Sequence, residues 1–113
     1  MPATILVERA EHRLKIQIRP RGMTLTKTQH VRLTRELDLV LARYGERIDR
    51  VIVDVSDAEV AGLTSCEIEV RFKPQIVKVE HSDTDVYLAM EHALTRTARS
   101  VGRAIEAVGL PRP

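Results

Sequence analysis

Three arginines near the C-terminal end of the chain are the residues best suited to bind an anion. Arg96, Arg99 and Arg103 recur at three- and four-residue steps in a segment with helical periodicity, residues 85–108, so they form a stripe along one side of a helix. Each guanidinium is a planar fork that matches phosphate oxygens. The stripe indicates either an anionic partner or an ordinary solvated face that Glu91 and Glu106 neutralise.

The hydrophobic pattern predicts the elements that position this stripe. Leu14, Ile16 and Ile18 alternate with polar residues, as in a strand with one buried face, and Thr26 is a suitable N-cap for a helix that runs to about Tyr44. Apolar residues of the last segment recur at helical spacing on the side that must be buried. The predicted strands are 14–19, 51–55, 66–73 and 76–80, and the predicted helices are 26–44 and 85–108.

This order predicts an α+β fold, β-α-β-β-β-α. Because the strands alternate cleanly, the four-stranded sheet is expected to have one wet face and to carry both helices side by side on the other. Residues 1–13 form an N-terminal extension, in which 5–7 either add an edge strand or remain frayed. Residues 14–109 form the domain and 110–113 a tail.

Composition excludes several classes of protein. The 113 residues are 43% hydrophobic, enough for one domain with a modest core, and the formal net charge is only +2. An aromatic content of 3% without tryptophan argues against a surface that stacks single-stranded bases. A lone Cys66 excludes an internal disulfide and fits a reducing cytoplasm. The sequence contains no apolar run of membrane-spanning length, and charges at Glu8 and Arg9 interrupt any signal-peptide core.

Other basic residues are expected to enlarge the arginine stripe. Two helices on one side of a sheet can pool their outward cations, and the end of the first strand adds two more. The first helix contributes Lys27, His30, Arg32, Arg35 and Arg43, and the end of the first strand contributes Arg19 and Arg21. We expect them to form one electropositive surface with Arg96, Arg99 and Arg103, and we expect the open sheet face to be mixed in charge and not to be the docking side.

Catalysis and metal binding are not expected. Cys66 lies on the apolar side of its strand, where a thiol is a small inert hydrophobe. His81, Asp83 and Asp85 precede a helix, where carboxylates usually cap its amide groups, and His92 has no second histidine at ligand spacing. The sequence contains no phosphate-cradling glycine loop or nucleophile motif. We therefore predict no enzyme, no metal, no cofactor and no small-molecule substrate.

Several segments together resemble the bacterial ribosome hibernation-promoting factors and ribosome-associated inhibitors, also called sigma-54 modulation proteins. The segments are Leu25-Thr26, Arg43-Tyr44-Gly45-Glu46-Arg47-Ile48, Val51-Ile52-Val53-Asp54-Val55-Ser56-Asp57, Cys66-Glu67-Ile68-Glu69-Val70 and Asp85-Val86-Tyr87-Leu88-Ala89-Met90. The last is the most specific, and together they cover about 14–108. The resemblance implies a basic module that binds the small ribosomal subunit and its rRNA in the channel for messenger and transfer RNA, and silences idle ribosomes under stress or starvation. We expect the isolated protein to be a cytoplasmic monomer.

The resemblance also bears on individual residues. Arg96, Arg99 and Arg103 match places where family members contact rRNA through Lys or Arg, and His30 matches a commonly basic place. Glu36 departs from the pattern, as do the acid-rich strand faces and the end of the last helix, which lacks a basic tail. We expect a short form without a second domain. The alternative is a protein-interaction module of the same fold that has lost RNA binding and uses its sheet face or a strand edge.

Overall fold

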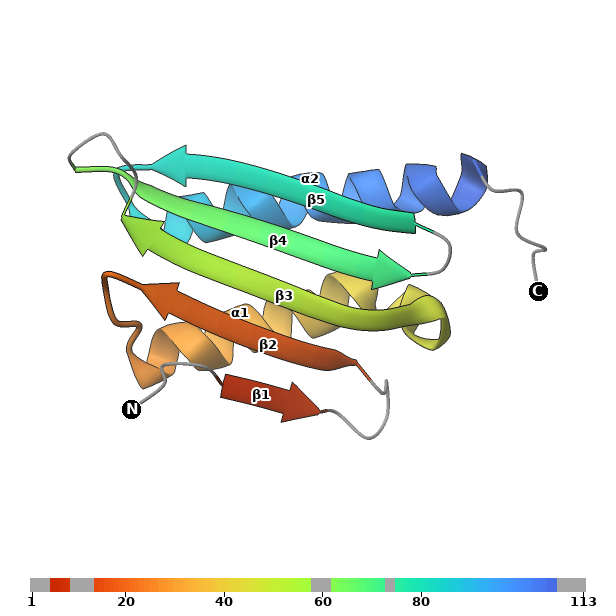
Figure 1. Ribbon diagram of the computed structural model, residues 1–113, viewed down its shortest axis with the longest axis horizontal. Helices are drawn as coiled ribbons and strands as arrows, with labels where there is room; N and C mark the ends of the chain where they lie inside the picture. Colours follow the sequence, from red (N-terminus) through yellow and green to blue (C-terminus); the bar gives the residue numbers. More distant parts are fainter. Residues whose placement is uncertain (1–4, 9–13, 58–61, 73–74, 108–113) are drawn as a thin grey trace.

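The computed structural model describes residues 5–8, 14–57, 62–72 and 75–107. They form one five-stranded sheet in the order β1-β2-β3-β4-β5 (Figure 1). The strands β2 and β3 are parallel, and each of the other neighbouring pairs is antiparallel. The strand bounds are β1 Ile5–Glu8, β2 Lys15–Arg21, β3 Ile48–Asp57, β4 Thr64–Phe72 and β5 Gln75–Asp83.

Two helices cover one face of this sheet. Helix α1 spans Lys27–Leu41 and continues as a 3-10 helix, η1, over Ala42–Arg47, whereas α2 spans Val86–Ala107. Figure 1 shows α1 behind β2 and β3 and α2 behind β4 and β5, with the other face of the sheet open toward the viewer. The predicted β-α-β-β-β-α order and the side-by-side helices are confirmed. The open question at residues 5–7 is also answered, because they belong to the additional edge strand β1.

Strand alternation places the apolar residues between sheet and helices. The alternate apolar residues 16 and 18 of β2, 51, 53 and 55 of β3, and 66, 68, 70 and 72 of β4 are at most 1% exposed. They point toward the helices, and leucines of α1 and apolar residues of α2 pack against them. This core includes Ile16, Ile18, Val51, Val53, Val55, Ile68, Val70, Phe72, Leu33, Leu37, Leu41, Met90, Leu94 and Val101. Since each buried side chain of this size contributes about 1.5–3 kcal/mol, the covered face holds the domain together.

Local signals fix the start of α1 as predicted, but not its end. The Thr26 hydroxyl accepts a hydrogen bond from the Gln29 amide at 3.1 Å, and the Gln29 side chain accepts one from the Thr26 amide at 2.8 Å. Helix α1 was expected to run to Tyr44, whereas its α-helical part ends at Leu41. The chain tightens there into η1, whose last turn is closed by a bond from the Ile48 amide to the Gly45 carbonyl.

The start of α2 depends on two aspartates. The Asp85 carboxylate accepts hydrogen bonds from the amides of Tyr87 (2.7 Å) and Leu88 (3.3 Å), and the Asp83 carboxylate accepts one from the Asp85 amide (3.1 Å). The predicted capping role is confirmed. Strand β5 was predicted to end at Glu80 but continues to Asp83, because its pairing with β4 extends as far as Thr64. In the described residues, neither helix combines the length and apolar character needed to cross a membrane.

Candidate nucleic-acid interface

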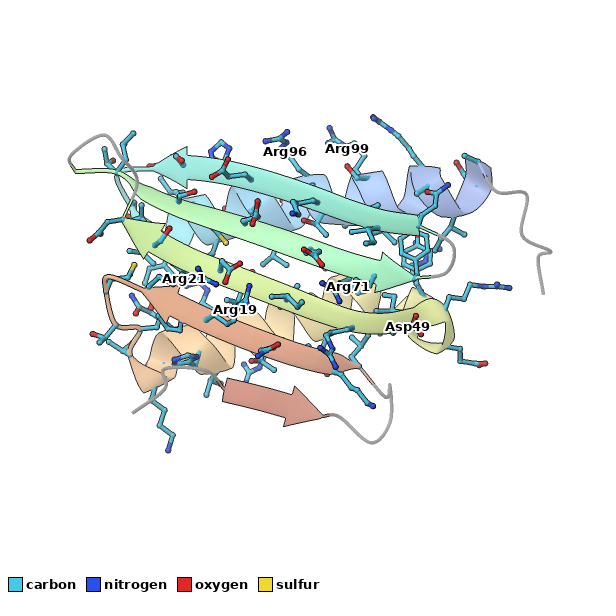
Figure 2. The ribbon with its side chains drawn as sticks, viewed as in Figure 1. Arg19, Arg21, Asp49, Arg71, Arg96 and Arg99 are labelled. Carbon is cyan, nitrogen blue, oxygen red and sulfur yellow. The ribbon has the colours of Figure 1, made fainter. Side chains whose placement is uncertain are left out.

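The arginine stripe of α2 lies along the outer edge of β5. At 100° per residue, Arg96, Arg99 and Arg103 fall within an arc of about 60° and span about 10 Å of the helix axis. All three are exposed. Figure 2 shows Arg96 and Arg99 projecting outward beyond β5, away from α1. Three guanidinium groups therefore point from one edge of the molecule into solvent.

Carboxylates do not neutralise this stripe. Among the ion pairs of the described residues, none involves Arg96, Arg99 or Arg103, so the alternative of pairing with Glu91 and Glu106 is not seen. Arg96 instead donates a hydrogen bond from Nη1 to the backbone carbonyl of Glu80 at 2.9 Å. This contact fixes the guanidinium against the edge strand and uses one of its five N–H groups. The positive charge of the stripe remains available to a partner.

The basic residues of α1 lie elsewhere. Arg32 pairs with Glu36 at 3.0 Å and lies over the ring of Tyr87 at 4.7 Å, so it joins α1 to α2. Tyr87 is about 160° around α2 from Arg103, which places the stripe on the side of α2 that faces away from α1. Lys27 is exposed in the first turn of α1. The two helices therefore do not bring their cations together.

His30 is poorly suited to bind a phosphate. Its Nδ1 is buried and has no hydrogen-bond partner among the described residues. Partial burial lowers the pKa of His30 below the ordinary value of 6.5, because the charged imidazolium loses hydration. At neutral pH this side chain is therefore mostly uncharged. It keeps its match to the family pattern but contributes little positive charge.

Arg19 and Arg21 lie on the opposite face of the sheet. Their neighbours in β2, Ile16 and Ile18, point into the core, so alternation turns the arginines toward the open face, which Figure 2 shows. Arg19 forms a two-pronged ion pair with Asp54, at 2.7 and 2.9 Å, and Arg21 approaches the same carboxylate at 3.6 Å. The expectation of one electropositive surface that includes both arginines is wrong.

The open sheet face is mixed in charge, as predicted, and many of its charged residues pair with one another. Glu69 of β4 pairs with Arg71 and, at 3.6 Å, with Lys78 of β5. The hydroxyl of Ser65 donates to the Glu80 carboxylate at 2.7 Å. Such partly exposed pairs contribute little stability, about 0–1 kcal/mol each. They do, however, leave little unbalanced charge for an anionic ligand.

Cys66 is buried, as the sequence predicts. Its side chain is fully shielded from solvent, and burial raises the pKa of the thiol to about 12. A thiol that stays protonated is a poor nucleophile. A shallow hollow between α1 and α2, bordered by Arg32, Glu36 and Tyr87, has a cavity volume of about 10 Å³, room for about one water molecule, so it is too small for a small-molecule ligand.

One pair of residues was missed by the sequence analysis. His92 of α2 and His81 of β5 lie with Nδ1 and Nε2 only 3.1 Å apart, and Asp83 is close to both. The eleven-residue separation of the histidines carries no recognised ligand motif. Their proximity results from the return of α2 along β5, which sequence spacing does not reveal.

Comparisons with known proteins show that this chain has a fold similar to that of solved structures. No protein-family model matches the sequence, and no curated protein matches it. Among solved structures, the N-terminal domain of Protein Y from Thermus thermophilus is similar, with a TM-score of 0.65, 25% identity, and coverage of 76% of this chain and 92% of that domain. A ribosomal subunit interface protein from Coxiella burnetii is also similar, with a TM-score of 0.71, 9% identity, and coverage of 79% and 94%. The chain therefore has the fold shared by a Protein Y N-terminal domain and a ribosomal subunit interface protein.

Proposed function

We propose that this protein binds the small ribosomal subunit through rRNA phosphates, with Arg96, Arg99 and Arg103 as the main contacts. The observation that carries the proposal is the row of three exposed arginines along one edge, without carboxylate partners in the described residues. The likeness to Protein Y and to a ribosomal subunit interface protein supports the choice of the ribosome as partner.

The physical character of the surface favours recognition of folded RNA by shape. Arginine forks bind phosphate oxygens in pairs, and folded RNA presents phosphates and 2′-hydroxyl groups more readily than base edges. None of the exposed side chains in the stripe is aromatic, so stacking on unpaired bases contributes little. Lys27 lies outside the stripe and is proposed as a secondary contact, whereas Arg19, Arg21, Arg32 and His30 are weaker candidates because they are paired or uncharged.

Binding in the channel for messenger and transfer RNA would silence translation without catalysis. This part of the proposal follows from the sequence resemblance to hibernation factors, in which a basic domain occupies that channel during stress. The arginine row supplies an attachment site, and the bulk of the domain supplies the obstruction. Addition of purified protein to a cell-free translation reaction is therefore expected to lower protein synthesis in proportion to the fraction of ribosomes occupied.

Co-sedimentation with purified small subunits tests the site. Wild-type protein is expected to pellet with the subunits at low salt, and a variant with Arg96→Glu, Arg99→Glu and Arg103→Glu is expected to stay in the supernatant. A matched variant with Arg35→Glu, Arg47→Glu and Arg50→Glu changes the net charge equally at exposed positions away from the stripe. It should still pellet.

Each outcome bears on the proposal. An equal loss of pelleting in both variants would mean that net charge, and not the arginine stripe, governs binding. Unchanged pelleting of the stripe variant would refute the site, and failure of the wild-type protein to pellet would refute ribosome binding. That last result would favour a protein-interaction module of the same fold. Circular dichroism of each variant checks that the domain remains folded.

A further inference from the structure

A cluster of three potential metal ligands lies where β5 meets the first half of α2. His81 and Asp83 belong to β5, and His92 belongs to α2. One ligand atom from each, two imidazole nitrogens and a carboxylate oxygen, lies within 4.8 Å of the others. The imidazole rings meet edge to face, with centroids 4.8 Å apart and an interplanar angle of 85°.

The spacing of the nitrogens fits a shared ion. Two ligands at the Zn–N distance of about 2.0–2.1 Å in a tetrahedral arrangement lie about 3.3 Å apart. Nδ1 of His92 and Nε2 of His81 are 3.1 Å apart, so small ring rotations bring both lone pairs onto one ion. Two imidazoles with a carboxylate are a ligand set that zinc and neighbouring divalent transition metals accept.

The carboxylate is held in place and charged. One oxygen of Asp83 accepts hydrogen bonds from the Asp85 amide at 3.1 Å and the Thr84 hydroxyl at 3.4 Å, which leaves the second oxygen available. Aspartate carboxylates are ordinarily ionised at neutral pH, which is the form that binds a metal ion. His81 and Asp83 are half-buried and His92 is exposed, so an ion has a route of entry.

We propose that His81, Asp83 and His92 bind one divalent transition-metal ion of the zinc class. The three side chains supply three ligands, and water occupies the remaining, solvent-facing position. The ion joins β5 to α2, and it lies beside the arginine stripe, since His92 precedes Arg96 by about one helical turn. This proposal is independent of ribosome binding.

The competing explanation is a hydrogen bond between two neutral imidazoles. One nitrogen then donates and the other accepts, and the same 3.1 Å separation results without a metal. In that explanation the Asp83 carboxylate only caps the start of α2, where it accepts a hydrogen bond from the Asp85 amide. The same explanation predicts no saturable metal binding, so the two explanations separate in a titration.

The test uses the untagged full chain. Isothermal titration with Zn²⁺ is expected to show one site per chain, and added Zn²⁺ is expected to raise the melting temperature. Titration with Co²⁺ is expected to develop visible absorption bands characteristic of fewer than six ligands. His92→Ala, His81→Ala and Asp83→Asn should each weaken binding on the order of tenfold to a hundredfold or more, since even loss of an outer hydrogen-bond partner of a ligand has that effect.

Two matched variants keep the test specific. Glu91→Gln removes a carboxylate next to His92, and His30→Gln removes a histidine from α1, so both should bind Zn²⁺ like the wild-type protein. Absence of saturable binding by the folded wild-type chain would overturn the proposal. Undiminished binding by His92→Ala would also overturn it, and because His92 is exposed, this variant is expected to remain folded.

Discussion

Replacing Arg96, Arg99 and Arg103 with glutamine should change the salt dependence of ribosome binding by a calculable amount. Each phosphate neutralised by an arginine releases condensed counterions and adds about 0.7–0.9 to the slope of log affinity against log salt. The three guanidinium groups are exposed and have no carboxylate partners in the described residues, so all three can contribute. Loss of the stripe should therefore reduce the slope by about 2–3.

This reduction in slope corresponds to a large change in affinity over an experimentally accessible range of salt concentration. Between about 50 and 200 mM salt, the stripe alone should account for about a 20- to 40-fold fall in affinity. Fluorescence anisotropy of labelled protein with small subunits, at five or six salt concentrations, measures both slopes. The variant Arg35→Gln, Arg47→Gln and Arg50→Gln is the control of equal charge and should keep the wild-type slope. A stripe variant with an unchanged slope would refute the assignment of phosphate contacts to α2.

Three further predictions concern the stability of the domain. Cys66→Ser should lower the free energy of unfolding by about 1–3 kcal/mol in urea denaturation, because a buried hydroxyl replaces an apolar contact. In the wild-type protein, the thiol has a pKa of about 12 and should react with a thiol reagent only after unfolding. Burial lowers the pKa of His30, so below about pH 6.5 this residue binds more protons in the unfolded state than in the folded state. Its contribution to stability is therefore complete above that pH and is lost on acidification. Between pH 7 and 5, the free energy of unfolding of His30→Gln should fall less than that of the wild-type protein. Gly102→Ala adds a Cβ 3.2 Å from the Tyr44 hydroxyl, which must shift slightly. The higher helix propensity of alanine stabilises the helix by about 0.8–1 kcal/mol. A small net rise in the urea midpoint is therefore expected, and a fall would mean that Tyr44 cannot move.

The sequence predicted those parts of the fold that depend on local patterns. Alternation at Leu14, Ile16 and Ile18 identified β2, and Thr26 as an N-cap predicted the start of α1. Prediction failed where contacts between residues far apart in the sequence determine the structure. The last residues of β5 lack alternation, and their pairing with β4 extends the strand to Asp83. Similarly, α1 changes to a 3-10 helix after Leu41, which the apolar spacing up to Tyr44 does not indicate.

The candidate site was predictable only within a single element. Helical spacing placed Arg96, Arg99 and Arg103 on one side of α2, and the structure agrees. Whether other cations join them depends on how the elements pack. Ile18 points toward the helices, so strand alternation turns the next residue, Arg19, away from them. The expectation that Arg19 shares one surface with the helix cations therefore conflicted with a pattern visible in the sequence. The approach of His81 to His92 depends on the path of α2 along β5 and has no local signal.

The division of the covered face between two helices has a consequence for synthesis of the chain. Helix α1 lies over β2 and β3, whereas β4 and β5 are covered by α2, which follows all five strands in the sequence and so leaves the exit tunnel after them (Figure 1). Until residues 86–107 emerge, apolar side chains such as Ile68, Val70 and Phe72 lack their cover. Because synthesis proceeds from the N-terminus, the β4–β5 half of the sheet stays exposed to misassembly until α2 has been made.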